Sequence, residues 1–187
     1  PGGSAYISEQ IWRQVVELKK VKPVVVSMGN VAASGGYYIS CAANKIIAEP
    51  NTLTGSIGIF GMFPNASGLF GKLALTTDIV KTNTFSDLGD LSRPMTESEK
   101  ALIQGYVERG YQTFLSRCAE GRGMTTEAVN AIGQGRVWTG EQAKERGLVD
   151  ELGGIELAIS TAAGLAGLDQ YSAVSYTHLR AHETKAN

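Results

Sequence analysis

The sequence predicts an α/β fold in which a largely parallel, layered sheet is flanked by helices. A helical pattern from Ser4 to about Lys20 is followed directly by an apolar strand at Val24–Met28, which is half of a strand–helix–strand unit. Apolar runs and helical periodicities continue to alternate along the chain. Glycine makes up 23 of the 187 residues and is dispersed among apolar runs, as tight strand–helix turns require.

The first helix is expected to begin after Ser4, a favourable N-cap residue, and to end near Lys20. One face of this helix carries four apolar residues, Ile7, Ile11, Val15 and Leu18. The Val24–Met28 run is almost continuously apolar and stops at Gly29 and Asn30. It therefore predicts a central strand that is buried on both faces.

Further strands are expected at Lys45–Ala48, Ser56–Phe63 and Thr76–Lys81, and a polar loop at residues 82–95. A capping box at Thr96–Glu99 then opens a long amphipathic helix that ends at residues 121–123. Its expected buried face consists of Leu102, Ile103, Tyr106, Val107, Tyr111, Phe114, Leu115 and Cys118. Three shorter helices are expected at about Thr126–Ile132, from the Thr139 capping box to Gly147, and at about Ile155–Leu165.

Composition excludes several classes of function. The net charge is −1 and no basic stripe is visible, so nucleic acid is not an expected partner. There is no metal-binding motif or phosphate loop, so neither a metal nor another cofactor is expected. Cys41 and Cys118 form no C-x-x-C pair and are interpreted as packed thiols.

Ser34 is predicted to lie where a strand turns into a short buried helix. Its hydroxyl would then be at the positive end of the helix dipole, beside free backbone amides. Two interpretations fit this position: an ordinary N-cap, which is the commoner role, and a nucleophile on a tight turn. The small residues of Ala32–Gly36 would let another chain approach the hydroxyl closely.

Several segments, in the same order, resemble the signal peptide peptidase A family, also called protease IV. They are Pro1-Gly2-Gly3-Ser4, Ala33–Tyr38, Thr54–Gly58 and Gly135–Gly140, with Ala143 and Gly147–Asp150. The resemblance covers Pro1 to about Leu168. Members are Ser/Lys proteases on the fold shared with the Clp protease proteolytic subunit and the crotonases, so it implies a ClpP/crotonase-like fold.

The resemblance implies a catalytic site. Ser34 would be the nucleophile, and the oxyanion would be stabilised by the amide of Gly35 and one amide of the Gly2-Gly3 turn, that of Gly3 in preference to that of Gly2. Extended peptides, by family resemblance remnant signal peptides, would add along a sheet edge, with small or apolar side chains entering shallow pockets.

The general base is expected to come from outside this chain. Both histidines, His178 and His182, lie in the terminal tail, which argues against a Ser-His-Asp triad. A lysine can replace histidine if its pKa falls from about 10.4 to near 7, which corresponds to about 4 to 5 kcal/mol. Where single-repeat members carry that lysine, this chain has Ser86. Lys81 is the nearest substitute, although a solvated strand-end lysine is the more ordinary interpretation.

In the long members, two homologous repeats share the site, with the serine in the C-terminal repeat and the lysine in the N-terminal one. Resemblance therefore implies that residues 1–170 are a C-terminal protease repeat, truncated at its N-terminus, and that the missing repeat supplies the lysine. The parent protein would be anchored in the bacterial inner membrane, face the periplasm and form a homotetramer. The fragment itself has no membrane-spanning run and is expected to be soluble.

Two alternatives remain open at this stage. A crotonase-type acyl-CoA enzyme would use similar oxyanion amides but has no need of a serine at position 34, and a non-catalytic assembly repeat would keep Ser34 as an N-cap only. Residues 174–187 change composition sharply and are interpreted as a non-native tail.

Overall fold

Parallel strand pairing dominates the computed structural model, which describes residues 2–176. One sheet has the strand order β1-β3-β6, formed by β1 (Val25–Met28), β3 (Lys45–Ala48) and β6 (Glu151–Leu152). Both strand pairs in this sheet are parallel. Because β3 lies in the middle and its isoleucines are fully buried, the prediction that Val24–Met28 is the central strand is wrong, and β1 is an edge strand of the described sheet.

A second sheet contains the strand that precedes both Ser34 and the helix after it. It has the order β2-β4-β5, formed by β2 (Val31–Ala33), β4 (Leu53–Gly55) and β5 (Val137–Thr139). β2 and β4 are parallel, whereas β4 and β5 are antiparallel. The predicted α/β class with largely parallel strands is confirmed, but the strands are divided between two small sheets.

Two predicted strands, Ser56–Phe63 and Thr76–Lys81, are wrong: neither segment forms a strand among the described residues. Backbone pairing continues only a short way past β4, where the Ser56 amide donates to the Arg136 carbonyl and the Gly135 amide to the Ile57 carbonyl. Residues 60–65 are exposed, and the Phe60 side chain is 85% accessible. An apolar run forms a strand only where a neighbouring backbone can pair with it.

The first helix, α1 (Ala5–Lys19), is capped by the Ser4 side chain as predicted. Its orientation differs from the simplest expectation, because Ile7, Ile11 and Leu18 are exposed while Ser8 and Trp12 are buried. Trp12 instead packs into the core with residues of α2 (Gly35–Ser40) and of the long helix α4 (Glu97–Arg122). Packing between specific helices, rather than the apolar stripe alone, therefore sets the buried face of α1.

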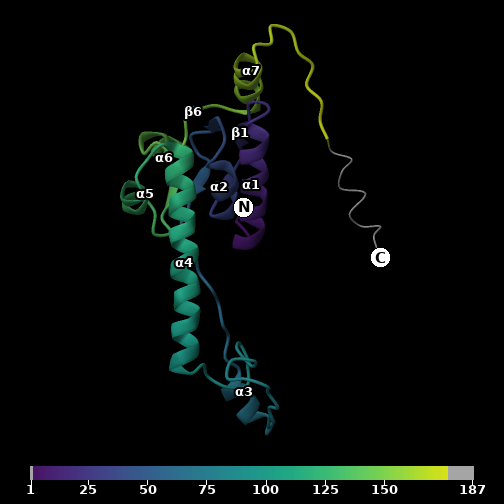
Figure 1. Cartoon of the computed structure of the whole chain (residues 1–187), viewed down its shortest axis with the longest axis vertical. Helices are drawn as coiled ribbons and strands as arrows, with labels where there is room; N and C mark the ends of the chain where they lie inside the picture. Colours follow the sequence, from purple (N-terminus) through teal and green to yellow (C-terminus); the bar gives the residue numbers. More distant parts are fainter. Residues whose placement is uncertain (1, 177–187) are drawn as a thin grey trace.

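The long helix α4 (Glu97–Arg122) begins at the predicted Thr96 capping box and ends at Gly123, which has left-handed backbone. Only its C-terminal half is a core helix: Phe114, Leu115 and Cys118 are buried, whereas Tyr106 is 63% exposed. Figure 1 shows the reason, since the N-terminal half of α4 extends away from the body of the protein. The predicted continuous buried face is therefore confirmed only in part.

Residues 64–95 form an arm at the far end of α4 (Figure 1). The arm contains a short helix that the sequence did not predict, α3 (Ser67–Lys72), and the predicted loop at residues 82–95 is confirmed. Arg93 connects the arm to α4, because its guanidinium donates to Asp87 at 2.7 Å and to Glu99 at 2.6 Å. Hydrogen bonds from the Arg93 side chain, the Thr96 backbone amide and the Thr96 hydroxyl lower the pKa of Glu99 to about 2.

Acid should loosen the contact between the arm and α4. The pKa of Glu99 in the folded chain lies below its ordinary value of 4.5, so its stabilisation is complete above pH 4.5 and is lost as the pH falls toward 2. We expect amide hydrogen-exchange protection factors in residues 81–95 to decline over that range. Glu99→Gln should lower protection at neutral pH and leave only the smaller dependence due to Asp87, whose pKa is also lowered, by Lys81 and Arg93. An unchanged pH profile in Glu99→Gln would contradict this role.

The remaining helices agree with the predictions: α5 (Thr126–Ile132), α6 (Gly140–Glu145), which starts at the Thr139 capping box, and α7 (Ile155–Leu165). Asp150 connects the segment after α6 to the first sheet and to α4. Its carboxylate accepts hydrogen bonds from the Ile46 amide at 2.7 Å and from Arg122 at 3.0 Å.

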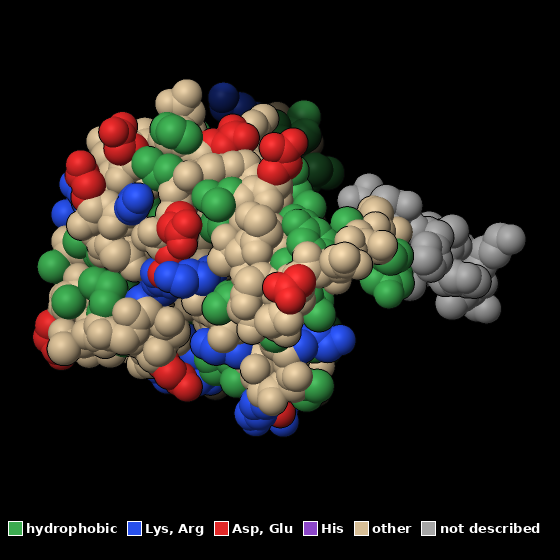
Figure 2. Space-filling model, turned by 90° about the horizontal axis from the view of Figure 1, so that it is seen from above, with side chains coloured by type: hydrophobic (Ala, Val, Ile, Leu, Met, Phe, Trp, Pro, Cys, Tyr) green, Lys and Arg blue, Asp and Glu red, His purple; other side chains and the backbone are tan. Residues whose placement is uncertain are grey.

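Figure 2 shows both acidic and basic side chains on the face seen from above. Within residues 2–176, no helix is long and apolar enough to cross a bilayer. Most of the predicted non-native tail, residues 177–187, lies outside the described residues.

Candidate active site

Ser34 lies at a strand-to-helix turn, as predicted, but the strand that leads into it is β2, which the sequence did not predict. Its amide donates to the Gly55 carbonyl at 2.9 Å, and its carbonyl accepts from the Tyr38 amide at 2.8 Å, so the backbone is held on both sides. The backbone angles are φ 53° and ψ −118°, a region that serine rarely adopts. Within the described chain the Ser34 side chain makes no capping hydrogen bond, so the ordinary N-cap interpretation does not account for it.

Backbone strain is concentrated around Ser34. Four non-glycine residues among residues 2–176 have positive φ, and three of them, Ser34, Ser56 and Gln134, line one cavity of about 550 Å³. Each such residue costs of order 1–3 kcal/mol and persists only where the surroundings enforce it. Strain of this kind is typical of functional sites, where it directs a reactive group into a cavity.

The glycines named with Ser34 are brought together by the fold. A Cβ atom on Gly2 would lie 3.0 Å from the Ser34 Cβ and 3.4 Å from its Oγ. A Cβ atom on Gly35 would lie 2.9 Å from the Gly3 amide nitrogen and 2.7 Å from the Ser8 Oγ. The Gly2-Gly3 turn and the start of α2 therefore pack backbone to backbone beside the hydroxyl, which only residues without side chains permit.

A polar cluster holds the N-terminal half of α1 against α2 and α4. Glu9 accepts hydrogen bonds from the Tyr38 hydroxyl and from Arg117, the latter at 2.7 Å. Burial opposes ionisation of Glu9, but the bonds from Arg117 and Tyr38 outweigh it and lower its pKa. The cluster thereby fixes the end of α1 that follows the Gly2-Gly3 turn.

The lysine that the proposed dyad needs is not found beside Ser34 in the part of the chain that the structure describes. Among the described residues, no lysine lines the Ser34 cavity. Lys81 lies in the arm, where it pairs with Asp87 at 3.0 Å and is partly exposed. Ser86 lies in the same arm, and its hydroxyl accepts from the Asn83 amide at 3.2 Å. Neither residue is brought to the Ser34 cavity.

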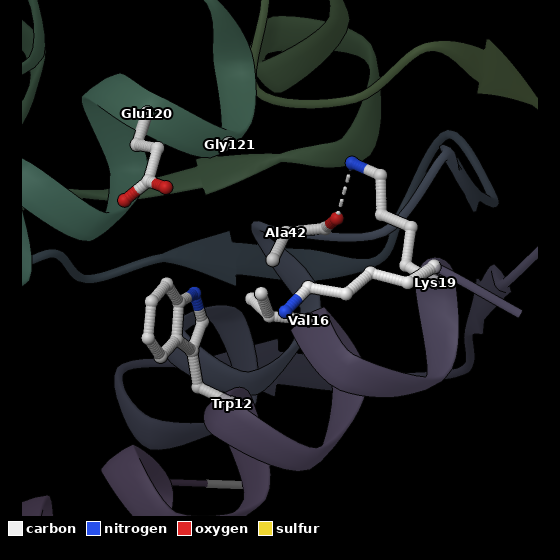
Figure 3. A pocket seen from close by; sticks show the side chains of 7 residues that line it. Trp12, Val16, Lys19, Ala42, Glu120 and Gly121 are labelled. Carbon is white, nitrogen blue, oxygen red and sulfur yellow. Dashed lines mark hydrogen bonds between the residues drawn. The ribbon is translucent and has the colours of Figure 1, made fainter.

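A second cavity contains lysines but not the serine. It has a volume of about 370 Å³ and lies beyond the C-terminal end of α2, between α1 and α4 (Figure 3). There the Lys19 Nζ donates to the Ala42 carbonyl at 2.8 Å, a bond that Figure 3 shows as a dashed line. This lysine satisfies a carbonyl after α2 and does not line the Ser34 cavity.

Several walls of the Ser34 cavity are not predicted by the sequence. Tyr111 is expected in the core, yet its hydroxyl donates to Asn130 at 2.7 Å, accepts from the Gln134 amide at 2.9 Å and helps to line the cavity. Glu108 also lines it and carries no recognisable signal. The flanking glycines in Gly133-Gln134-Gly135 are the one available sign of the strained turn at Gln134.

The two cysteines lie in the core, away from the Ser34 cavity. Cys41 and Cys118 are both buried and free, and burial raises the pKa of the Cys118 thiol. Their interpretation as packed thiols therefore agrees with the structure. Among residues 2–176, no group of three or more histidine, cysteine, aspartate or glutamate side chains could hold a metal ion.

The architecture defines the class as α/β proteins of the ClpP/crotonase-like fold. A solved structure of a mutant of 1510-N, a membrane-bound stomatin-specific protease, is similar with a TM-score of 0.54 and 16% identity over 95% of this chain and 74% of that one. Within this class, the chain belongs to Peptidase family S49, whose family model matches residues 16–169. The resemblance to signal peptide peptidase A is thereby confirmed, and family membership favours a peptidase over the acyl-CoA alternative.

Curated relatives agree with this assignment. Protease 4 of Salmonella typhi is 43% identical over 172 residues, which are 91% of this chain and 28% of the relative. The chloroplastic serine protease SPPA of Arabidopsis thaliana is 38% identical over 96% of this chain and 27% of the relative. The chain thus spans about a quarter to a third of the length of these relatives.

Proposed function

We propose that this chain is the nucleophile-bearing repeat of a serine endopeptidase. The observation that carries the proposal is Ser34 itself: a strained serine whose hydroxyl makes no capping bond, at the wall of a cavity and beside bare glycine backbone. Its Oγ would attack the carbonyl carbon of a peptide bond. The amides of Gly35 and Gly3 would stabilise the oxyanion, and each such donor is typically worth about 3 kcal/mol in the transition state.

In this proposal a lysine accepts the Ser34 proton and passes it to the amine that leaves when the C–N bond breaks. Water then hydrolyses the acyl-enzyme ester and regenerates Ser34. The absence of a lysine from the described lining of the cavity supports a base from another repeat of the protein. The alternative base, Lys81, would have to leave its ion pair with Asp87 and cross from the arm.

The substrates, the cellular location and the oligomeric state of the whole protein are proposed from its family. Remnant signal peptides are the proposed substrates, presented as extended strands. The protein would act at the periplasmic face of the bacterial inner membrane as a homotetramer, with its membrane anchor outside this chain.

Labelling with a fluorophosphonate probe tests the shared site, with intact mass as the readout. We expect no stoichiometric labelling of this chain alone and labelling of one serine after the lysine-bearing repeat is added. The Ser34→Ala variant should not be labelled under either condition. Labelling of the chain alone would place a base within it and overturn the shared site. If the folded chain stays unlabelled under both conditions, the non-catalytic assembly repeat becomes the better description.

A further inference from the structure

The cavity that contains Ser34 has a charged wall. Glu108, on the exposed N-terminal half of α4, is the one charged residue among the described residues that line this cavity. The other walls are apolar or neutral and include Ile59, Phe60 and Val107. A carboxylate in the lining is not expected of a pocket that receives only small or apolar substrate side chains.

The carboxylate of Glu108 is available to a ligand. One oxygen accepts a hydrogen bond from the Gln104 side chain at 2.8 Å, and within residues 2–176 no lysine or arginine forms an ion pair with it. The nearby cations are engaged elsewhere: the Arg109 guanidinium lies 4.9 Å from the centre of the Tyr106 ring, and Arg136 donates to the Ala131 and Gly133 carbonyls. Glu108 thus retains acceptor capacity that the protein itself leaves unfilled.

Hydrogen bonds hold the part of the lining around Tyr111 and Gln134 in place. The Tyr111 hydroxyl bonds both Asn130 and the Gln134 amide, and the Gly135 amide donates to the Ile57 carbonyl at 2.9 Å. These bonds hold the strained turns at Ser56 and Gln134 in place. The lining thus combines apolar side chains with one carboxylate, which suits a long apolar stem with a cationic end.

We propose that Glu108 is a specificity-determining residue that selects peptides with a lysine or arginine side chain in the cavity beside Ser34. The inference rests on the proposed function, because it assumes that peptides bind next to Ser34. Glu108 acts by charge complementarity and takes no part in the chemical step. Aliphatic side chains fit the same walls but leave the carboxylate without a cationic partner.

The test measures binding without turnover, on this chain carrying Ser34→Ala. Dissociation constants are measured by NMR titration for acetyl-Ala-Ala-Lys-amide and for its norleucine analogue, which has the same stem without the ammonium group. An exposed ion pair is worth up to about 1 kcal/mol, so we expect the lysine peptide to bind about three- to fivefold more tightly. High salt should reduce the difference.

Substitutions then test whether Glu108 causes the difference in affinity between the two peptides. Glu108→Gln should bring the ratio close to one, Glu108→Lys should invert it, and Glu120→Gln, a matched change on the same helix outside this cavity, should leave it unchanged. Equal affinities in the parent chain, binding of neither peptide, or a preference that survives Glu108→Gln would overturn the inference. Because Ser34 is absent from every sample, failure of the proposed chemistry appears only in the labelling experiment and leaves this measurement unaffected.

Discussion

Replacing Ser34 with alanine should abolish peptide cleavage by the complete protein that contains this chain. Removal of a serine nucleophile eliminates the covalent pathway, and losses of about 10⁴-fold or more in kcat are typical. Cleavage is measured with a fluorogenic peptide together with the thermal unfolding midpoint. Alanine has to adopt the same positive φ as serine, so the midpoint should change little.

A glycine substitution at position 34 tests whether the backbone strain of Ser34 lowers the stability of the protein. Glycine adopts the backbone of Ser34 without steric cost, so Ser34→Gly should be equally inactive yet as stable as the parent or more stable, by up to about 1 kcal/mol. A serine with a structural role only would give destabilised variants with normal cleavage. Cleavage at the parental rate in both variants would disprove the nucleophile assignment.

Gly35→Ala should cause the second large loss of activity. The new Cβ would lie 2.9 Å from the Gly3 amide nitrogen, closer than a Cβ approaches backbone, and 2.7 Å from the Ser8 hydroxyl. Ser8 can rotate, but the Gly3 backbone has to move away from Ser34. We expect kcat to fall about 10²- to 10³-fold, as when one oxyanion donor is lost, and stability to fall by about 1–3 kcal/mol.

Gly68→Ala is the matched control, because a Cβ at Gly68 in α3 would meet no atom within 4 Å. Both variants are compared by steady-state kinetics and by denaturant unfolding. A loss of stability without a loss of kcat in Gly35→Ala would mean that the contact between the Gly2-Gly3 turn and α2 serves only packing.

Local sequence determined most of the helices. The Thr96 and Thr139 capping boxes place a hydroxyl and a side-chain acceptor three residues apart, so each start depends on neighbouring residues and agrees with the structure. Strands were less predictable. β2, β4, β5 and β6 are two to three residues long and exist only because distant backbone pairs with them, whereas the apolar Ser56–Phe63 run found no such partner beyond Ile57.

Some residues of the candidate site could likewise be recognised from the sequence, and others only from the tertiary structure. Ser34 could be named as a candidate from its turn, whereas Gly35 and the Gly2-Gly3 turn were assigned to the site through the resemblance to the family. The strained backbone of Ser34 and the walls formed by Glu108 and Gln134 could not, because they depend on which segments the fold packs together. By itself the sequence determined the turn that presents Ser34, a matter of neighbouring residues; only the tertiary structure decided what surrounds its hydroxyl, because cavities are formed by residues far apart in the chain.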